Sequence, residues 1–69
     1  MDVRSPGVGK VLRVEVIAGA HVERGQELMV IESMKVEIPI KAPIAGHVKE
    51  LHAKVGDQVQ RNRILIKIE

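Results

Sequence analysis

No cysteine, phenylalanine, tyrosine or tryptophan occurs among the 69 residues of this chain. The lack of cysteine excludes disulfide bonds and thiolate metal sites, and the lack of large aromatic side chains means that any core must be aliphatic. The chain has eleven valines and eight isoleucines. Because branching at Cβ restricts χ1 and suits a pleated surface, this composition favours β-strands. A chain of this length predicts one small domain.

The chain also lacks a long apolar run and any cluster of like charges. No apolar stretch approaches the roughly 20 residues needed to span a bilayer, and the N-terminal residues do not follow the pattern of a signal peptide, so we expect a soluble domain. The 11 Lys and Arg residues are interspersed with 9 Asp and Glu residues, leaving a formal net charge of +2. Without a basic patch or an aromatic platform for bases, nucleic-acid binding is not expected.

The sequence repeats itself, without a gap, at an offset of 37 positions. Residues 5–32 align with residues 42–69, and the matches include prolines, turn glycines and aliphatic positions: Pro6 with Pro43, Gly9 with Gly46, Gly19 with Gly56, Val22 with Val59, Leu28 with Leu65 and Glu32 with Glu69. An internal repeat dictates architecture. Two copies predict one domain, residues 1–69, with an approximate two-fold axis relating residues 1–32 to residues 38–69. Residues 33–37 are left over between the halves.

Glycine and asparagine mark turns between short aliphatic runs in each half. Gly19 and Gly56 follow runs rich in valine and leucine. Gly25 aligns with Asn62, and Asn is the usual substitute for Gly where φ is positive. No stretch has convincing helical periodicity. Many short strands separated by such turns predict an all-β sandwich or barrel.

The leftover segment lies within IESMKVEI, residues 31–38, which predicts a β-hairpin with Met34-Lys35 as its two-residue loop. In this register Glu32 pairs with Glu37, and alternation puts four apolar side chains on one buried face: Met29, Ile31, Ile38 and Ile40. Such loops need φ > 0 and favour Asn-Gly, so Met and Lys there cost roughly 1–2 kcal/mol each. Like charges placed opposite each other cost up to about 1 kcal/mol more. We interpret so unfavourable a turn as one kept for something other than folding.

Around this hairpin the sequence resembles the biotinyl/lipoyl attachment family, in its biotin carboxyl carrier branch. The resemblance is carried by ESMK at the turn and by SPGVGKV, AGAHVERGQ, ESMKVEIPI, APIAGHVKE and VGDQVQRN, which cover nearly the whole chain. It implies a flattened barrel (a barrel-sandwich hybrid) of two four-stranded antiparallel sheets, with the lysine exposed at one end and the termini at the other. The chain departs from the family pattern at Val36, where a second Met is usual, at Gly7-Val8 and at Ala20.

The resemblance also implies a function for the turn. A biotin protein ligase would join biotin to the ε-amine of Lys35 through an amide and would recognise the residues around it: Glu32, Ser33, Met34, Val36 and Glu37. The biotin would then take a carboxyl group from a biotin carboxylase to a carboxyltransferase, so the domain would be a carrier and not an enzyme by itself. We expect a monomer in isolation, without membrane or nucleic-acid partners, located in the cytoplasm or, if cut from a eukaryotic carboxylase, in the mitochondrial matrix.

Three other functions compete with this interpretation. A lipoyl carrier of a 2-oxo acid dehydrogenase-type complex shares the implied fold, but that branch typically has Asp before the lysine and Ala after it, where this chain has Met34 and Val36. An unmodified interaction module of the same fold would not need an intact attachment motif. An enzyme is disfavoured because His47 and His52, five positions apart on an expected strand, would point to opposite faces and make poor joint metal ligands.

Overall fold

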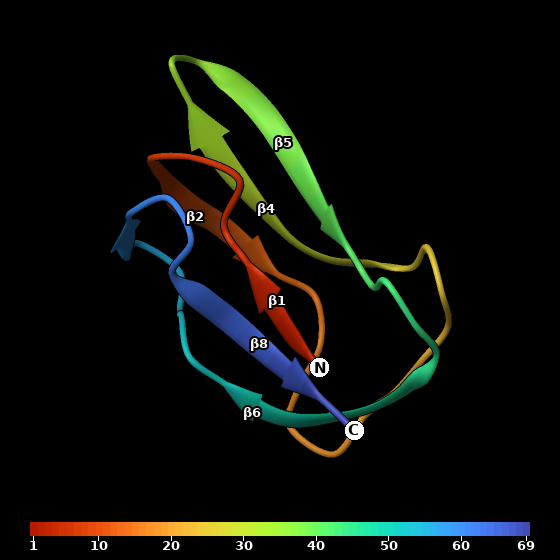
Figure 1. Ribbon diagram of the computed structural model, residues 1–69. Coiled ribbons are helices and arrows are strands. Elements are labelled where there is room, and N and C mark those ends of the chain that lie inside the picture. The colour runs from red at the N-terminus through yellow and green to blue at the C-terminus, as the bar shows by residue number, and fades with distance from the viewer.

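The computed structural model describes all residues, 1–69, and consists of eight β-strands joined by turns (Figure 1). The strands are β1 Asp2–Arg4, β2 Gly9–Val14, β3 His21–Val22, β4 Glu27–Ser33, β5 Val36–Lys41, β6 Gly46–Leu51, β7 Gln58–Val59 and β8 Ile64–Ile68. Most of the valines and isoleucines lie in these strands, as their branched side chains favour. The chain forms no helix that is long and apolar enough to cross a membrane.

The strands form two four-stranded antiparallel sheets, ordered β1-β8-β6-β3 and β5-β4-β2-β7. Adding the repeat offset of 37 to the residues of β1 to β4 gives segments that overlap β5 to β8, so the repeat relates β1 to β5, β2 to β6, β3 to β7 and β4 to β8. Replacing each strand of one sheet by its repeat-related strand gives the strand order of the other sheet. Each sheet therefore takes two strands from each half of the chain, so the halves are interlocked. The predicted fold class, two four-stranded antiparallel sheets with a pseudo-two-fold repeat, is confirmed, although the two sheets do not close into one hydrogen-bonded barrel.

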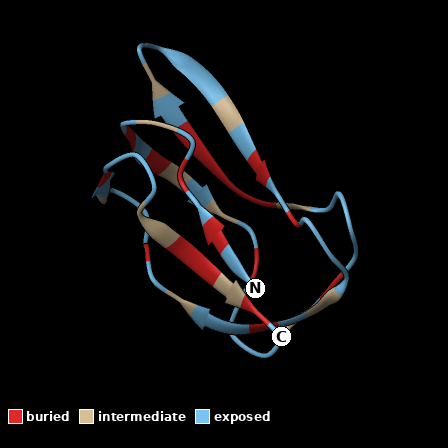
Figure 2. Ribbon diagram, in the orientation of Figure 1, coloured by how far each residue is buried: buried red, intermediate tan, exposed pale blue.

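Fifteen buried aliphatic residues form the core between the sheets (Figure 2). Repeat-related residues are buried together: Val11 with Val48, Val22 with Val59, Leu28 with Leu65, Met29 with Ile66 and Ile31 with Ile68. Of the four side chains predicted to share a buried face of the hairpin, three belong to this core and Ile38 is half-buried against it. Strict alternation fails at Val30, which is only 2% exposed yet lies outside the core, opposite Arg13 and Pro39.

Two glycines fix how closely neighbouring strands approach each other. A Cβ atom on Gly9 would lie 2.4 Å from Ile31 Cγ2 and 2.7 Å from the carbonyl oxygen of Glu32. At the repeat-related place, a Cβ atom on Gly46 would lie 2.6 Å from the carbonyl oxygen of Glu69. Because the obstacle at each position includes backbone, no change of side-chain rotamer could relieve it. The fold therefore requires glycine at both positions.

The close approach at Gly9 can be tested by adding a single methyl group. We expect Gly9→Ala to lower the free energy of unfolding by about 1–3 kcal/mol, the usual effect of forcing atoms into a packed site. Gly7→Ala is the matched control, because a Cβ atom there meets nothing within 4 Å and the backbone φ is not positive. Chemical denaturation of the two variants measures the difference, and equal stabilities would contradict the contact.

Candidate functional site

The β4–β5 hairpin extends past the strand beside it and carries its turn to one end of the molecule. The first residue of β2 that pairs with β4 is Lys10, opposite Glu32, so Ser33 and the turn lie beyond that ladder. In Figure 1 the turn is at the opposite end from both chain termini. The termini meet there, with the backbone N–H of Ile68 donating to the carbonyl oxygen of Met1 at 2.8 Å.

The register of the hairpin is the one that the sequence predicts. Ser33 pairs with Val36 directly beside the loop, and Glu32 pairs with Glu37. The ladder continues through the predicted partners Ile31 with Ile38, Val30 with Pro39 and Met29 with Ile40. The two-residue loop is therefore Met34-Lys35, and this part of the prediction is confirmed.

Both loop residues adopt the left-handed conformation that the turn requires. Their φ angles are 50° at Met34 and 67° at Lys35, which is the pattern of a type I′ turn. L-residues with a Cβ atom avoid this region, apart from Asn and Asp. The only other non-glycine residue with positive φ is Asn62, at 70°, where the short polar side chain suits the conformation. Backbone strain is thus concentrated at Met34 and Lys35.

Nothing in the fold covers the turn. Met34 is 93% exposed and Val36 is 60% exposed. The side chain of Lys35 is also exposed and takes part in none of the five ion pairs of the chain. The turn therefore presents an unengaged amine between two apolar side chains, an arrangement that a partner enzyme could recognise.

The two glutamates beside the turn have cationic neighbours that the sequence pattern alone does not predict. Arg13 Nη1 donates to Glu37 Oε1 at 3.4 Å, and Lys10 lies directly opposite Glu32 on the neighbouring strand. The ion pair with Arg13 offsets part of the repulsion between Glu37 and Glu32, whereas Lys10 forms no ion pair with Glu32. Both glutamates remain exposed, so the ion pair contributes little to stability.

A shallow hollow of about 420 Å³ lies directly beside the turn, and we call it the hairpin hollow. It occurs where the hairpin extends past the start of β2, and seven residues line it: Val8, Gly9, Lys10, Glu32, Ser33, Met34 and Gln58. Its polar side chains, those of Lys10, Glu32, Ser33 and Gln58, take part in no hydrogen bond or ion pair within the chain.

The histidines lie elsewhere and do not form a metal site. His21 pairs with His47 across β3 and β6, and their ring centroids are 5.2 Å apart in an edge-to-face arrangement. His52 follows β6 and hydrogen-bonds Glu50. No group of three or more potential ligands is positioned to hold a metal ion. The sequence did not predict the contact between His21 and His47, because it depends on the pairing of two strands far apart in the chain.

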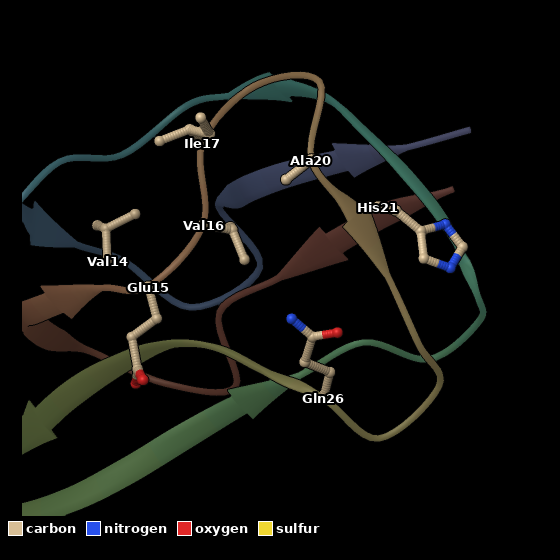
Figure 3. Close-up of a pocket in the computed structure, with 7 residues that line it drawn as sticks. All are labelled: Val14, Glu15, Val16, Ile17, Ala20, His21 and Gln26. Atoms are coloured by element: carbon tan, nitrogen blue, oxygen red, sulfur yellow. The ribbon is translucent and has the colours of Figure 1, made fainter.

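A second hollow, of about 350 Å³, lies past the end of β2 that is farther from the turn, and seven residues line it: Val14, Glu15, Val16, Ile17, Ala20, His21 and Gln26 (Figure 3). In Figure 3 the side chains of Glu15 and His21 lie on opposite sides of the view and do not converge on a common point. The one perturbed group here is Glu15. Although Glu15 is exposed, hydrogen bonding with the Glu27 carboxyl group, then desolvation and repulsion by the Glu27 charge, raise its pKa, and the charge of Arg13 opposes the shift.

Comparisons with known proteins place this geometry among carriers. The family model described as "Biotin-requiring enzyme" matches residues 1–68. A "Biotin/lipoyl attachment protein" of Bacillus subtilis (strain 168) is 43% identical over 68 residues, which are 99% of this chain and 93% of that protein. "Methylcrotonoyl-CoA carboxylase subunit alpha, mitochondrial" of Oryza sativa subsp. japonica is also 43% identical over 68 residues, which are 99% of this chain but only 9% of that protein.

A solved structure gives the same result for the fold. The urea carboxylase of Kluyveromyces lactis contains a segment that superposes on 100% of this chain with a TM-score of 0.93 and 29% sequence identity, and the segment is 6% of the carboxylase chain. The chain therefore spans most of one small relative and only a small part of the large carboxylases it matches.

Relief of the backbone strain at the turn is measurable. We expect the double variant Met34→Asn/Lys35→Gly to raise the free energy of unfolding by about 1 kcal/mol or more, because both new residues accept φ > 0. Asn62→Gly serves as the control, since Asn already suits that position and little should change. Denaturant unfolding reports both values. A double variant less stable than the parent would show that the turn is not strained.

The pKa of Glu15 gives a pH-dependent prediction. Because the folded state favours protonated Glu15, the stabilisation that this contact provides is present in acid and is lost as the pH rises through the raised pKa. Glu15→Gln keeps a hydrogen-bond donor without the charge, so we expect a higher Tm than the parent at neutral pH. The difference should shrink below the ordinary glutamate range. Thermal unfolding of both chains, at neutral pH and at a pH below the ordinary glutamate range, tests this. A difference in Tm between the variant and the parent that is the same at both pH values would contradict the prediction.

Proposed function

The chain belongs to the biotinyl/lipoyl attachment family, in its biotin carboxyl carrier branch, and we propose that Lys35 is the residue that carries biotin. Carrier domains of this family are not catalytic by themselves. The observation that carries the proposal is the turn itself. It presents a strained, exposed Met34-Lys35 pair within the ESMK motif, at the only segment that the internal repeat leaves unmatched.

The chemistry of attachment belongs to a partner ligase. No side chain of the domain hydrogen-bonds or ion-pairs with Lys35 to activate its amine. In the proposed step, Nζ of Lys35 bonds to the carboxyl carbon of biotin after ATP activates that carboxyl group. The activating group leaves with its electron pair, and the amine releases a proton. The domain contributes presentation: a fixed turn with the amine directed away from the sheets.

The residues around Lys35 fit recognition by a biotin protein ligase. Met34 offers an exposed apolar contact on one side of the lysine, and Val36 offers a smaller one on the other. Glu32 and Glu37 supply negative charge beside them, and Glu37 forms an ion pair with Arg13. Ser33 pairs with Val36 as the last pair of the hairpin before the loop. We assign these five residues to ligase recognition.

Once attached, biotin would carry a carboxyl group between two further partners, a biotin carboxylase and a carboxyltransferase. These two partners are what the family resemblance implies, and the relatives named as carboxylases support the proposal. The location proposed for the domain is that of its carboxylase: the cytoplasm, or the mitochondrial matrix for a eukaryotic enzyme. Residues 1–69 would act there as one carrier domain.

The edge strands support a monomeric carrier. β5 is the only edge strand longer than three residues, because β1, β3 and β7 are short. Pro39 lies within β5 and has no backbone N–H, so a further strand cannot add to this edge without losing a hydrogen bond.

A lipoyl carrier is the alternative within the same family. Its branch typically places Asp before the lysine and Ala after it, so an anionic and a small residue would flank the amine. Here both flanking residues are apolar and exposed, namely Met34 and Val36. This difference favours biotin.

The proposal is tested by intact-mass measurement after incubation with biotin, ATP and a biotin protein ligase. We expect the parent chain and Lys41→Arg, the control at the other end of β5, each to gain one biotinyl group. Lys35→Arg should gain none, although it keeps the charge. A parent chain that gains no biotin would overturn the assignment, and a gain of lipoate from a lipoate ligase instead would move the chain to the lipoyl branch.

A further inference from the structure

The hairpin hollow points to a second role for the surface beside the turn. We propose that it is the resting seat of the bicyclic head of biotin when the arm on Lys35 is not engaged by an enzyme. This inference rests on the proposed function, because it needs a biotinyl group on Lys35. The hollow begins at Met34, the residue that precedes the lysine, so a flexible arm can fold back into it.

The lining of the hollow fits the chemistry of that head. The sulfur-containing ring is apolar, and Val8 and Met34 provide exposed apolar surface, at 56% and 93% exposure. The ureido ring has one carbonyl acceptor and two N–H donors. Lys10 can donate to the carbonyl oxygen, and Glu32 can accept from an N–H. Because neither side chain is engaged within the chain, docking would break no existing contact.

The internal repeat supplies a comparison within the same molecule. The offset of 37 relates Lys10 to His47, and it relates His21 to Gln58. Lys10 pairs with Gln58 across β2 and β7, and His47 pairs with His21 across β6 and β3. At the end of the molecule with the termini, the two imidazole rings contact each other. Beside the turn, the same pair of positions lines an open hollow.

The two ends therefore share a backbone arrangement and differ in the side chains that occupy it. The surface has a third hollow, lined by Leu51, His52, Ala53 and Lys54. His21, the counterpart of Gln58, lines the hollow past the end of β2, but none of the three hollows is lined by His47 or Glu69, the counterparts of Lys10 and Glu32. The positions of Lys10 and Glu32 thus line a hollow beside the turn, whereas their counterparts line none. The fold does not demand this hollow, which matches a role linked to Lys35.

The affinity required is small, because the ligand is tethered. A short flexible tether gives an effective concentration of about millimolar. A hollow that binds free biotin with a Kd of only about 1 mM would then be occupied for roughly half of the time. Such weak docking leaves the arm available to its enzymes.

The test compares amide chemical shifts in chains that differ only at the tip. Because the chain has no cysteine, Lys35→Cys can be labelled at one site with biotin-maleimide or with N-ethylmaleimide, which has the same linkage without the bicyclic head. We expect the biotin label to shift the backbone amides of Gly9, Lys10 and Gln58 relative to the N-ethylmaleimide label. Shifts confined to residues 33–36 would overturn the proposal, whether or not any further variant folds.

A pair of matched variants assigns the effect to the hollow. Lys10→His/Gln58→His moves the imidazole pair of the other end into the hollow and should abolish the shift of Gly9. His47→Lys/His21→Gln, the reciprocal exchange, should leave that shift in place. Streptavidin capture gives a second measure, since a head docked half of the time is captured about twofold more slowly; filling the hollow should restore the faster rate. Equal rates of streptavidin capture in the labelled chain without further changes and in the two labelled double variants would count against the seat.

The ligase-modified parent separates this inference from the proposed function. If the ligase adds no biotin to Lys35, the proposed function fails while the maleimide-labelled Lys35→Cys chain still reports on the hollow. If the ligase adds biotin but no amide outside residues 33–36 shifts, the function stands and the seat is excluded.

Discussion

Gly9 lies so close to β4 that no side chain can be placed there, because a Cβ atom would fall 2.7 Å from the carbonyl oxygen of Glu32. This contact lies at the start of β2, and so it marks the point beyond which the hairpin extends alone. The same contact recurs between Gly46 and Glu69, so both sheets are held at matching spacing. The exposed turn and the hollow beside it both begin at this contact, since each lies where β4 continues without β2.

The unfavourable turn is tolerated because the strand that leads to it is deeply buried. Four consecutive residues of β4, Leu28 to Ile31, are each at most 2% exposed. Full burial of one such side chain contributes about 1.5–3 kcal/mol, whereas each left-handed L-residue costs roughly 1–2 kcal/mol. The burial of β4 therefore outweighs the strain at Met34 and Lys35.

Much of this arrangement is predictable from the sequence, because it depends on local pattern or on the repeat. The offset between the halves predicts matching sheets, and alternation around Met34-Lys35 predicts the hairpin pairs and the positive φ angles. The burial of Val30 and the contact between Arg13 and Glu37 are not predictable in this way. Both depend on the pairing of β2 with β4, whose register shifts between Val11 and Arg13. Such a shift changes which side chains share a face, and no local pattern records it.

The duplication separates what the fold requires from what the function requires. Core residues and the glycines at strand contacts recur in both halves, so they are explained by folding. The turn does not recur: its counterpart in the second half is the place where β8 ends beside the start of β1 and the chain ends meet. One end of the molecule is thus occupied by the termini, and the other is free to project an amine. On the proposed function, this end must be both accessible and fixed in shape, because several enzymes would have to reach Lys35 and the ligase would have to recognise the residues around it. A rigid base with a short strained tip satisfies both demands, whereas a flexible loop would provide reach without a fixed shape.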